Sequence, residues 1–391
     1  MRVAFSLVGG EHQFLHGVPV AAALSQREGV SVVAYTCDAH DAAALRAMVD
    51  RFGGQRVDIV EMRLPRWLEY CAARLSHAPT LKTVRLLRWA CAMRACDVLV
   101  ALERTSSLLK RLPGRCPALV HIPHGVGGAR RAGGGGVDPR FALFDLALVA
   151  GRSDYRSTLE LGLLRPDQVE IVGHVKLSGL QRLGMGARRL FANDKPTILY
   201  NPHFHPRRGS WDRFAEPLIR EIGARGRFNL IVAPHVRLFR DADPAERARW
   251  EALSDPGWLI VDTGSSKSVD MTYLLGADIY LGDFSSQVFE WMADPRPCVF
   301  IDQLGDGGAD DTKLPVMWSL GERVSELDAA LVALERSQAR HPEFAAAQRE
   351  AMLDATGDPA LPADEMAADR ILALVDERRG VGTAANPRKA A

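Results

Sequence analysis

Residues 278–290, DIYLGDFSSQVFE, contain the pattern that decides the fold. Residues 279–281 are apolar, which predicts a short buried strand, and a helical pattern begins at Gln287. Three residues of the kind that cap helices lie between the two elements: Asp283, Ser285 and Ser286. The free amides of such a helix start favour a phosphate, and Glu290 lies one turn later, where a carboxylate can contact ribose hydroxyls. An ordinary helix N-cap without a ligand is the alternative interpretation.

Short apolar runs alternate with helical patterns along the chain, which predicts βαβ units and parallel sheets. Seven strands are predicted first, at residues 3–8, 30–35, 56–61, 98–102, 118–122, 146–150 and 170–172. Five more follow, at residues 197–200, 229–233, 258–261, 279–281 and 298–301. Predicted helices include residues 18–27, 41–52, 80–94, 343–356 and 363–379. The expected fold class is α/β and GT-B-like, with two Rossmann-like domains whose parallel sheets face each other across a cleft.

The same pattern sets the expected domain boundaries. Residues 1–180 would form an N-terminal acceptor domain and residues 190–340 a nucleotide-donor domain, with residues 176–194 as the linker between them. Helices within residues 341–379 are expected to pack back on the first domain, and the polar tail 380–391 is expected to be disordered. Two glycines follow the first strand, but no Gly-x-Gly-x-x-Gly motif does, which excludes the NAD-binding fingerprint.

Composition excludes several functional classes. The chain has 391 residues, 49 Lys and Arg against 48 Asp and Glu, and a net charge of +1, so nothing indicates nucleic-acid binding. The six cysteines form no CxxC pair, which argues against a structural zinc site. No apolar run is long enough for a signal peptide or a spanning helix, so we expect a cytoplasmic protein.

A histidine motif ends the fifth predicted strand. His121 and His124 flank Ile-Pro, and Gly125 follows, where the backbone can turn sharply. Because ligands of open α/β sheets bind at the carboxyl ends of strands, we expect His124 to face the cleft as a general base. The glycine-rich loop 126–137 is expected to be mobile. The candidate acceptor-side residues are Arg130 and Arg131 in this loop and Gly125 directly before it.

The second half carries the expected donor site. His235 and Arg237 follow the strand at residues 229–233, in what we expect to be the topological position of His124, and would offset charge on a leaving phosphate. Other candidate donor contacts are Arg207, Ser265 and Ser266. His203 and His205 have a spacing that a metal can use, but no Glu or Cys completes a ligand set.

Residues 63–94 are rich in basic and aromatic side chains. Lys82, Arg85 and Arg88 share one helical stripe, which could contact the inner face of a membrane or a lipid-linked acceptor. The alternative is a solvated face on a core helix.

These motifs occur in a characteristic order: His124-Gly125, Gly173-His174-Val175-Lys176, Pro234-His235, and Asp283-Phe284-Ser285-Ser286 with Glu290. The order resembles that of the CDP-glycerol glycerophosphotransferase family, the teichoic-acid-polymerase-like GT-B enzymes, over roughly residues 117–302. The resemblance implies transfer without metal or cofactor from a CDP-activated polyol, or a related donor, to a surface-polymer acceptor. It implies that His124 and His235 are essential and that Ser285 and Ser286 contact the donor phosphates.

The sequence departs from that family in two places. The family commonly has Gly, Pro and Asp where this chain has Gly173-His174-Val175, and it has a different loop where this chain has residues 201–204, NPHF. The transferred group could therefore be a sugar. The hypothesis from sequence is a transferase whose partners are a nucleotide-diphosphate-linked donor and a glycan or lipid-linked acceptor. The alternatives are a UDP-sugar 2-epimerase, which would need carboxylates near the sugar, and a non-catalytic nucleotide- or glycan-binding protein.

Overall fold

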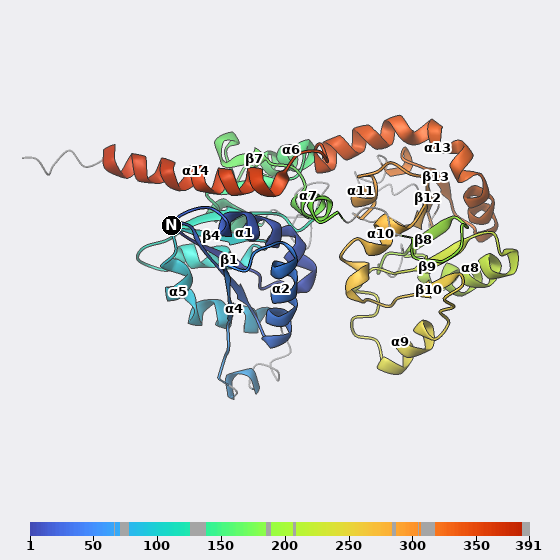
Figure 1. Ribbon diagram of the computed structural model, residues 1–391, viewed down its shortest axis with the longest axis horizontal. Coiled ribbons are helices and arrows are strands. Elements are labelled where there is room, and N and C mark those ends of the chain that lie inside the picture. The colour runs from blue at the N-terminus through green and yellow to red at the C-terminus, as the bar shows by residue number, and fades with distance from the viewer. Residues whose placement is uncertain are drawn as a thin grey trace, which may run out of the picture. The chain divides into compact units, whose positions relative to one another are not determined.

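The computed structural model describes residues 1–65, 67–70, 78–125, 138–184, 189–205, 209–283, 287–303, 305 and 317–384. The chain divides into two compact units (Figure 1). The first unit contains Met1–Gly184 and Asp354–Ala391, and the second contains Met185–Leu353. Each unit has its own parallel sheet with helices packed against it.

The first sheet has the strand order β3-β2-β1-β4-β5-β6-β7, with every pairing parallel. Its strands are β1 (Arg2–Ser6), β2 (Ser31–Thr36), β3 (Val57–Glu61), β4 (Val98–Ala101), β5 (Ala118–His121), β6 (Leu146–Val149) and β7 (Val169–Ile171). All seven lie close to the predicted ranges. Strands β4, β5 and β6 are buried along their whole length, as expected for parallel strands that helices cover on both faces.

The second sheet has the order β10-β9-β8-β11-β12-β13, again all parallel. Its strands are β8 (Thr197–Asn201), β9 (Asn229–Val232), β10 (Leu259–Val261), β11 (Ile279–Gly282), β12 (Cys298–Ile301) and β13 (Glu322–Val324). Five of them were predicted. Strand β13 was missed because it has the sequence Glu-Arg-Val and lies at the sheet edge, so it has no apolar run.

Helices connect these strands in both units. The first unit has η1 (Glu11–His16), α1 (Val18–Ser25), α2 (Ala39–Arg51), α4 (Ala78–Arg88), α5 (Ala90–Arg94), η2 (Thr105–Arg111), η3 (Pro139–Leu143), α6 (Arg152–Glu160), η4 (Pro166–Gln168), α7 (Val175–Arg182) and α14 (Ala363–Ala384). The second has α8 (Trp211–Arg225), α9 (Pro244–Glu251), η5 (Ser266–Ser268), α10 (Thr272–Gly276) and α11 (Gln287–Trp291). Helix α13 (Leu327–Thr356) begins in the second unit, and its last residues belong to the first.

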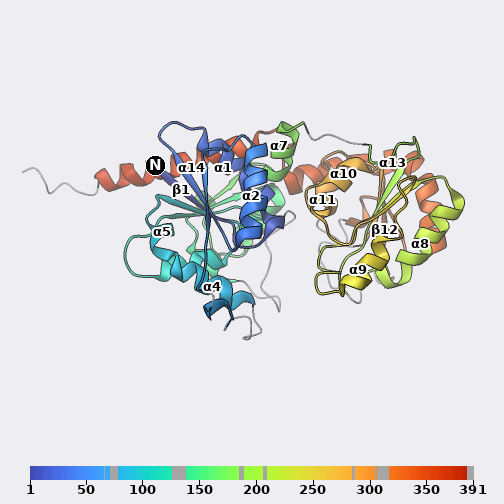
Figure 2. The ribbon, with the colours of Figure 1, turned by 60° about the horizontal axis from the view of Figure 1, so that its bottom comes forward.

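The structure corrects the expected linker and tail. Residues 175–182 form helix α7 instead of a linker, because Gly179 permits close packing: a Cβ there would lie 2.6 Å from Cγ of Pro19. Helix α13 begins well before residue 343, and α14 continues through residues 380–384, which we had assigned to the disordered tail. Helix α14 packs along α1 and α7 of the first unit (Figures 1 and 2). Residues 385–391 lie outside the described part of the chain.

The strand orders locate the ligand-binding edge of each sheet. In both sheets the order reverses next to the first strand of the unit, between β1 and β4 and between β8 and β11. Open α/β sheets bind ligands outside the carboxyl ends of the strands at such a reversal. Residues that follow these strands are therefore the candidates for chemistry.

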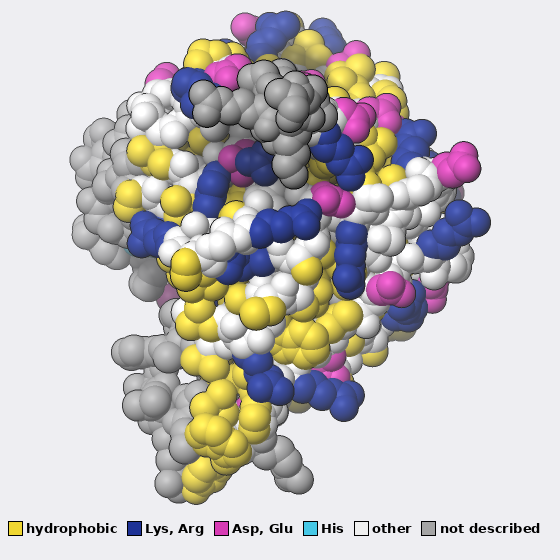
Figure 3. Space-filling model, turned by 90° about the vertical axis from the view of Figure 1, so that its left-hand side faces the viewer, with side chains coloured by type: hydrophobic (Ala, Val, Ile, Leu, Met, Phe, Trp, Pro, Cys, Tyr) yellow, Lys and Arg dark blue, Asp and Glu magenta, His cyan; other side chains and the backbone are white. Residues whose placement is uncertain are grey.

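Two residues of the basic stripe of α4 are held in ion pairs, whereas the third, Arg88, is exposed. Lys82 pairs with Glu103 at 3.2 Å and Arg85 with Glu69 at 3.1 Å, and both basic side chains are largely buried. The exposed residues near them include Trp67, Tyr70, Leu87 and Arg88. Figure 3 shows hydrophobic and basic side chains interspersed on the face that it presents. Among the described residues, no helix is long and apolar enough to cross a membrane.

Candidate functional site

A cavity of about 220 Å³ lies at the carboxyl edge of the first sheet. Its lining comes from α4, from the segments after β4 and β5, and from η3 and α6. The polar lining residues are Lys82, Glu103, Arg104, Thr105, His121, His124, Arg140, Asp154 and Thr158, and Gly125 also lines it. The predicted residues His124 and Gly125 are therefore brought to a cavity. Arg130 and Arg131, and the loop predicted to be mobile, lie outside the described residues.

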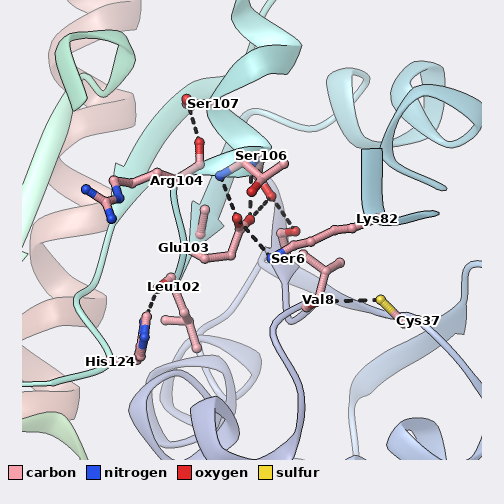
Figure 4. A network of polar contacts seen from close by, with 12 residues as sticks. Ser6, Val8, Cys37, Lys82, Leu102, Glu103, Arg104, Ser106, Ser107 and His124 are labelled. Carbon is pink, nitrogen blue, oxygen red and sulfur yellow. Dashed lines mark hydrogen bonds and ion pairs between the residues drawn. The ribbon is translucent and has the colours of Figure 1, made fainter. Parts of the chain in front are cut away.

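The hydrogen bond of His124 determines which of its nitrogens can accept a proton. Its Nδ1 lies 2.7 Å from the carbonyl oxygen of Leu102 (Figure 4). A carbonyl oxygen only accepts, so Nδ1 carries the hydrogen and the lone pair of the neutral ring is on Nε2. This is the arrangement that a general base requires.

Glu103 organises the cavity wall beside His124. Its buried carboxylate accepts hydrogen bonds from the amide of Thr105 at 2.5 Å and from the amide and hydroxyl of Ser106 at 3.0 and 2.5 Å. It also pairs with Lys82, and Ser106 contacts Ser6 at 2.7 Å (Figure 4). Burial raises the pKa of Glu103, but Lys82 and these hydrogen bonds outweigh burial, so the net pKa is lowered. The carboxylate is therefore ionised.

His121 has a structural role. Its Nδ1 lies 3.0 Å from the carbonyl oxygen of Ala101, and its ring contacts the rings of Phe141 and Phe144 at centroid distances of 5.1 and 4.8 Å. Burial lowers its pKa to about 4, so the ring is neutral at physiological pH. The two histidines of the motif thus have different roles.

Further basic residues lie near His124. The ring of His12 is 5.8 Å from that of His124, and the ring of His16 is 5.6 Å from that of His174. Burial, followed by the charge of Lys176 and the other histidines, lowers the pKa of His16 well below its usual value. The sequence reasoning missed His12 and His16, which follow Gly9-Gly10. That glycine pair was the available signal, but it was tested only as a dinucleotide turn.

The second unit places His235 in the opposite hydrogen-bonding state. Its Nδ1 accepts the backbone amide of Arg237 at 3.1 Å, so the hydrogen of the neutral ring is on Nε2. We had expected a protonated His235 to offset the phosphate charge beside Arg237, but a protonated ring could not accept this bond, so His235 can act there only as a neutral hydrogen-bond donor. The guanidinium of Arg237 lies 5.3 Å from the ring of Phe204, which packs on His235 at 4.7 Å.

His235 and His124 do not follow equivalent strands, contrary to our expectation. His235 follows β9, which neighbours the first strand of its unit, whereas His124 follows β5, two strands from β1 on the other side. The error arose because both histidines follow a short apolar run and a proline, which says nothing about strand order.

Asp283 joins two loops at the carboxyl edge of the second sheet. Its buried Oδ2 accepts the backbone amides of His203 at 2.9 Å and Ser210 at 2.8 Å. Burial raises its pKa to about 7, although these hydrogen bonds act in the other direction. This geometry gives Asp283 a role in holding the loops, where we had predicted donor contact. Glu290 is buried in α11.

Ser265 is also held within the protein. Its hydroxyl donates to Asp262 and accepts the amide of Lys267 at 3.2 Å, and Asp262 further accepts the hydroxyl of Tyr273 at 2.7 Å. Ser265 therefore caps the short helix η5, while Ser266 is exposed in its first position. The serine-rich turn is thus explained without a ligand.

Three predicted donor contacts cannot be placed. Arg207, Ser285 and Ser286 lie outside the described residues, so their roles stay predictions. Helix α11 begins at Gln287 as predicted, but it has only five residues, which limits its dipole.

Among the described residues, only Asp38, His40 and Asp41 bring three potential metal-binding side chains together. Asp38 and His40 are exposed, and Asp38 caps α2 by accepting the amide of Asp41 at 2.9 Å. The proximity of these three side chains is therefore explained by the N-terminal cap of α2.

Neither a protein-family model nor a curated protein matches this sequence. Solved structures do match. UDP-GlcNAc 2-epimerase from Neisseria meningitidis, bound to UDP-GlcNAc, aligns with a TM-score of 0.60 at 11% identity, covering 97% of this chain and 100% of that chain. The enzyme of that name from Methanocaldococcus jannaschii aligns with a TM-score of 0.59 at 11% identity, covering 96% of this chain and 100% of that chain. The wall teichoic acid polymerase TagF aligns with a TM-score of 0.62 at 12% identity, covering 96% of this chain and 89% of that chain. The chain therefore has the two-domain α/β fold of these proteins, which is GT-B-like.

Proposed function

We propose that this protein is a transferase that moves a polyol-phosphate or sugar group from a nucleotide-activated donor to a glycan or glycopolymer acceptor of the cell surface. A CDP-glycerol-like donor is our first choice. The fold is shared with TagF, of which one structure is described with CDPG, with MnaA described with UDP, and with a UDP-GlcNAc 2-epimerase described with UDP-GlcNAc. Those ligands support a nucleotide-diphosphate donor here.

The observation that carries the proposal is the position of the His124 lone pair. Nδ1 donates to Leu102, so Nε2 can take a proton, and His124 lines a cavity with other polar groups. For a CDP-glycerol-like donor, Nε2 of His124 would remove the proton of the acceptor hydroxyl while the oxygen of that hydroxyl forms a bond to the β-phosphorus of the donor. The bond from that phosphorus to the bridging oxygen breaks, and CMP leaves with the electron pair.

The second unit would serve the departing nucleotide. The Nε2–H of His235 can donate to a phosphate oxygen, and Arg237 supplies a positive charge nearby. With Ser285 and Ser286, these groups would offset the charge without a metal. That His124 and His235 act on one bound donor stays a prediction, as does an acceptor at the inner face of a membrane.

One observation supports the epimerase alternative. The sequence showed no obvious carboxylate pair, but the structure places Glu103 and Asp154 in the lining of the same cavity as His124. Two carboxylates and an imidazole around one cavity can move a proton on a sugar carbon. An epimerase would change a UDP-sugar without any acceptor, whereas a transferase needs one.

The test is a panel of CDP-, UDP- and GDP-linked donors, each incubated with and without polyol or glycan acceptors. We expect nucleotide release that depends on acceptor and requires His124. Epimerised UDP-sugar in the absence of acceptor would support the alternative. Nucleotide binding that raises the melting temperature, with neither reaction, would indicate a non-catalytic binding protein.

A further inference from the structure

We propose that the cavity beside His124 binds one uncharged unit of the acceptor, a polyol or a monosaccharide, and takes no phosphate group of the acceptor. This inference rests on the proposed function, because it assigns a chemical class to the group whose hydroxyl His124 would deprotonate. Three features of the cavity carry it: the volume, the pairing of its charged side chains, and the mixture of polar and apolar surface in its wall.

The volume of the cavity limits the ligand to one small unit. The cavity measures about 220 Å³, whereas pockets that hold drug-sized molecules measure about 300–1,000 Å³. A nucleoside diphosphate is a molecule of that larger size. Because a water molecule takes about 30 Å³ in the liquid, the cavity has room for about seven waters, which a glycerol or hexose unit would replace. All its lining residues belong to the first unit.

The basic side chains of the wall are paired with carboxylates of the same unit. Lys82 lies 3.2 Å from Glu103 (Figure 4), and Arg104 and Arg140 both contact Asp138, at 3.4 and 2.6 Å. The hydrogen bond from Arg140 is the main cause of the lowered pKa of Asp138, and Glu103 is ionised as described above. The positive charge of the described lining residues is therefore balanced close to its source, which disfavours a phosphate as the ligand.

Helix α6 adds a second carboxyl group and a hydroxyl group to the wall. Asp154 and Thr158 are four residues apart, so they lie on one face of the helix, and both line the cavity and are nearly fully buried. A phosphate would bring further negative charge beside the carboxyl groups of Asp154 and Glu103, which is unfavourable where water is scarce. A hydroxyl group of a polyol meets no such cost.

Hydroxyl groups match a wall that is made of ion pairs. A hydroxyl donates to a carboxylate and accepts from an ammonium or guanidinium group, so it can bond to both partners of a pair. Arg140 contacts Asp138 through Nε and Nη2, and a guanidinium has five N–H donors, so it can also donate to a ligand. Leu102, Pro123 and Phe141 supply apolar surface for the carbon atoms of the ligand.

The test is a titration of the full chain, labelled with ¹⁵N at histidine, with glycerol and glucose and, separately, with glycerol 3-phosphate and glucose 6-phosphate. Binding in the cavity is followed by the ring signals of His124 in ¹H–¹⁵N spectra. We expect at least one uncharged probe to shift the His124 signals and to leave those of His235 in place. Its phosphate ester should act on His124 at least about tenfold more weakly, because it brings like charges together.

Variants of α6 test the residues of the wall. Asp154→Asn should weaken the uncharged probe about tenfold, the usual effect of losing a charged hydrogen bond, and Thr158→Val about threefold. Asp154→Asn should also narrow the preference over the phosphate ester, which a purely structural role would not do. Asp50→Asn replaces an exposed aspartate of the same unit and is the matched control. Thermal unfolding checks that each variant folds, and CDP affinity measured by calorimetry should stay unchanged.

Three results would overturn the inference. The first is a phosphate ester that shifts the His124 signals at the same or lower concentration than its uncharged parent. The second is that neither uncharged probe shifts them, and the third is an unchanged preference in Asp154→Asn. The titrations contain no donor and measure no turnover, so their failure leaves the transfer assay valid, and failed transfer leaves the titrations valid.

Discussion

His124 and His235 lie at the carboxyl edges of two sheets whose first six strands have the same order, yet the two histidines have opposite tautomers. His124 donates from Nδ1 to a carbonyl oxygen, whereas His235 accepts a backbone amide at Nδ1. The first ring is left with a lone pair on Nε2 and the second with a hydrogen there. One topology can therefore supply both a base and a hydrogen-bond donor, because the backbone partner sets the tautomer.

The buried carboxylates near these histidines differ in the same way. Glu103 has an ammonium partner and side-chain donors, and its pKa is lowered, whereas Asp283 has two backbone amides, and burial raises its pKa to about 7. The presence of a cation decides whether a buried carboxylate stays ionised. Glu103 is thus ionised at neutral pH, whereas Asp283 titrates near neutral pH.

The largest expected effect is on His124. His124→Ala should lower transfer about 10³-fold because it removes the proton acceptor, while nucleotide affinity measured by calorimetry stays near the wild-type value. His40→Ala, which removes an exposed histidine of the same unit, is the control and should be fully active. Equal loss of nucleotide binding in His124→Ala would contradict its role as a base.

His235→Ala should lower transfer about 10²-fold, the usual effect of removing one hydrogen-bond donor to a developing charge. His235→Gln retains a side-chain N–H and should recover part of the rate. Steady-state rates of both variants sharpen the comparison with His124, for which glutamine supplies no base and should rescue nothing. Full activity of His235→Ala would remove it from the mechanism.

The pH dependence of stability should differ between the two carboxylates. The folded-state pKa of Asp283 is raised. Its contribution to the unfolding free energy is therefore fully present below the unfolded-state pKa near 4, and it is lost as the pH rises through about 7. We expect the unfolding free energy of the second unit to fall by roughly 4 kcal/mol over this window, at about 1.4 kcal/mol for each of about three pH units. Asp283→Asn should remove that slope in denaturant titrations followed by tryptophan fluorescence.

Glu103 provides the contrast in the same experiment. Its folded-state pKa is lowered. Its contribution to the unfolding free energy is therefore present above the unfolded-state pKa and is lost only as the pH falls through the folded-state pKa. Glu103→Gln should therefore leave the slope of the second unit between pH 4 and 7 unchanged. A slope that survives Asp283→Asn but disappears in Glu103→Gln would reverse our assignment.

The smallest expected effect concerns Ser265. Ser265→Ala should destabilise the second unit by about 1 kcal/mol, because the cap of η5 and the bond to Asp262 are lost, with little change in nucleotide affinity. The exposed Ser266→Ala should change neither quantity. A loss of nucleotide affinity without destabilisation would instead favour the donor contact that the sequence suggested.

Most of the fold could be predicted because the strands of a parallel sheet are apolar runs, and twelve of the thirteen described strands coincide with such a run. Strand β13 was missed because it is charged, and α7 because Gly179 resembles a linker residue. In neither case does local composition reveal the tertiary packing that decides the conformation.

The site was less predictable than the fold. His124 and His235 follow strands and were found from the sequence, but Glu103, Asp154 and His16 were missed because they belong to segments that are distant in the chain and come together only in the fold. The tautomers depend on backbone partners, namely the carbonyl of Leu102 and the amide of Arg237, which no sequence pattern shows.

The most direct test of the central claim is a long-range ¹H–¹⁵N correlation spectrum of the protein labelled at histidine nitrogen, with His124→Ala and His235→Ala for assignment. We predict that the neutral ring of His124 carries its hydrogen on Nδ1 and that of His235 on Nε2. The same tautomer at both positions, or the reverse pair, would contradict the account.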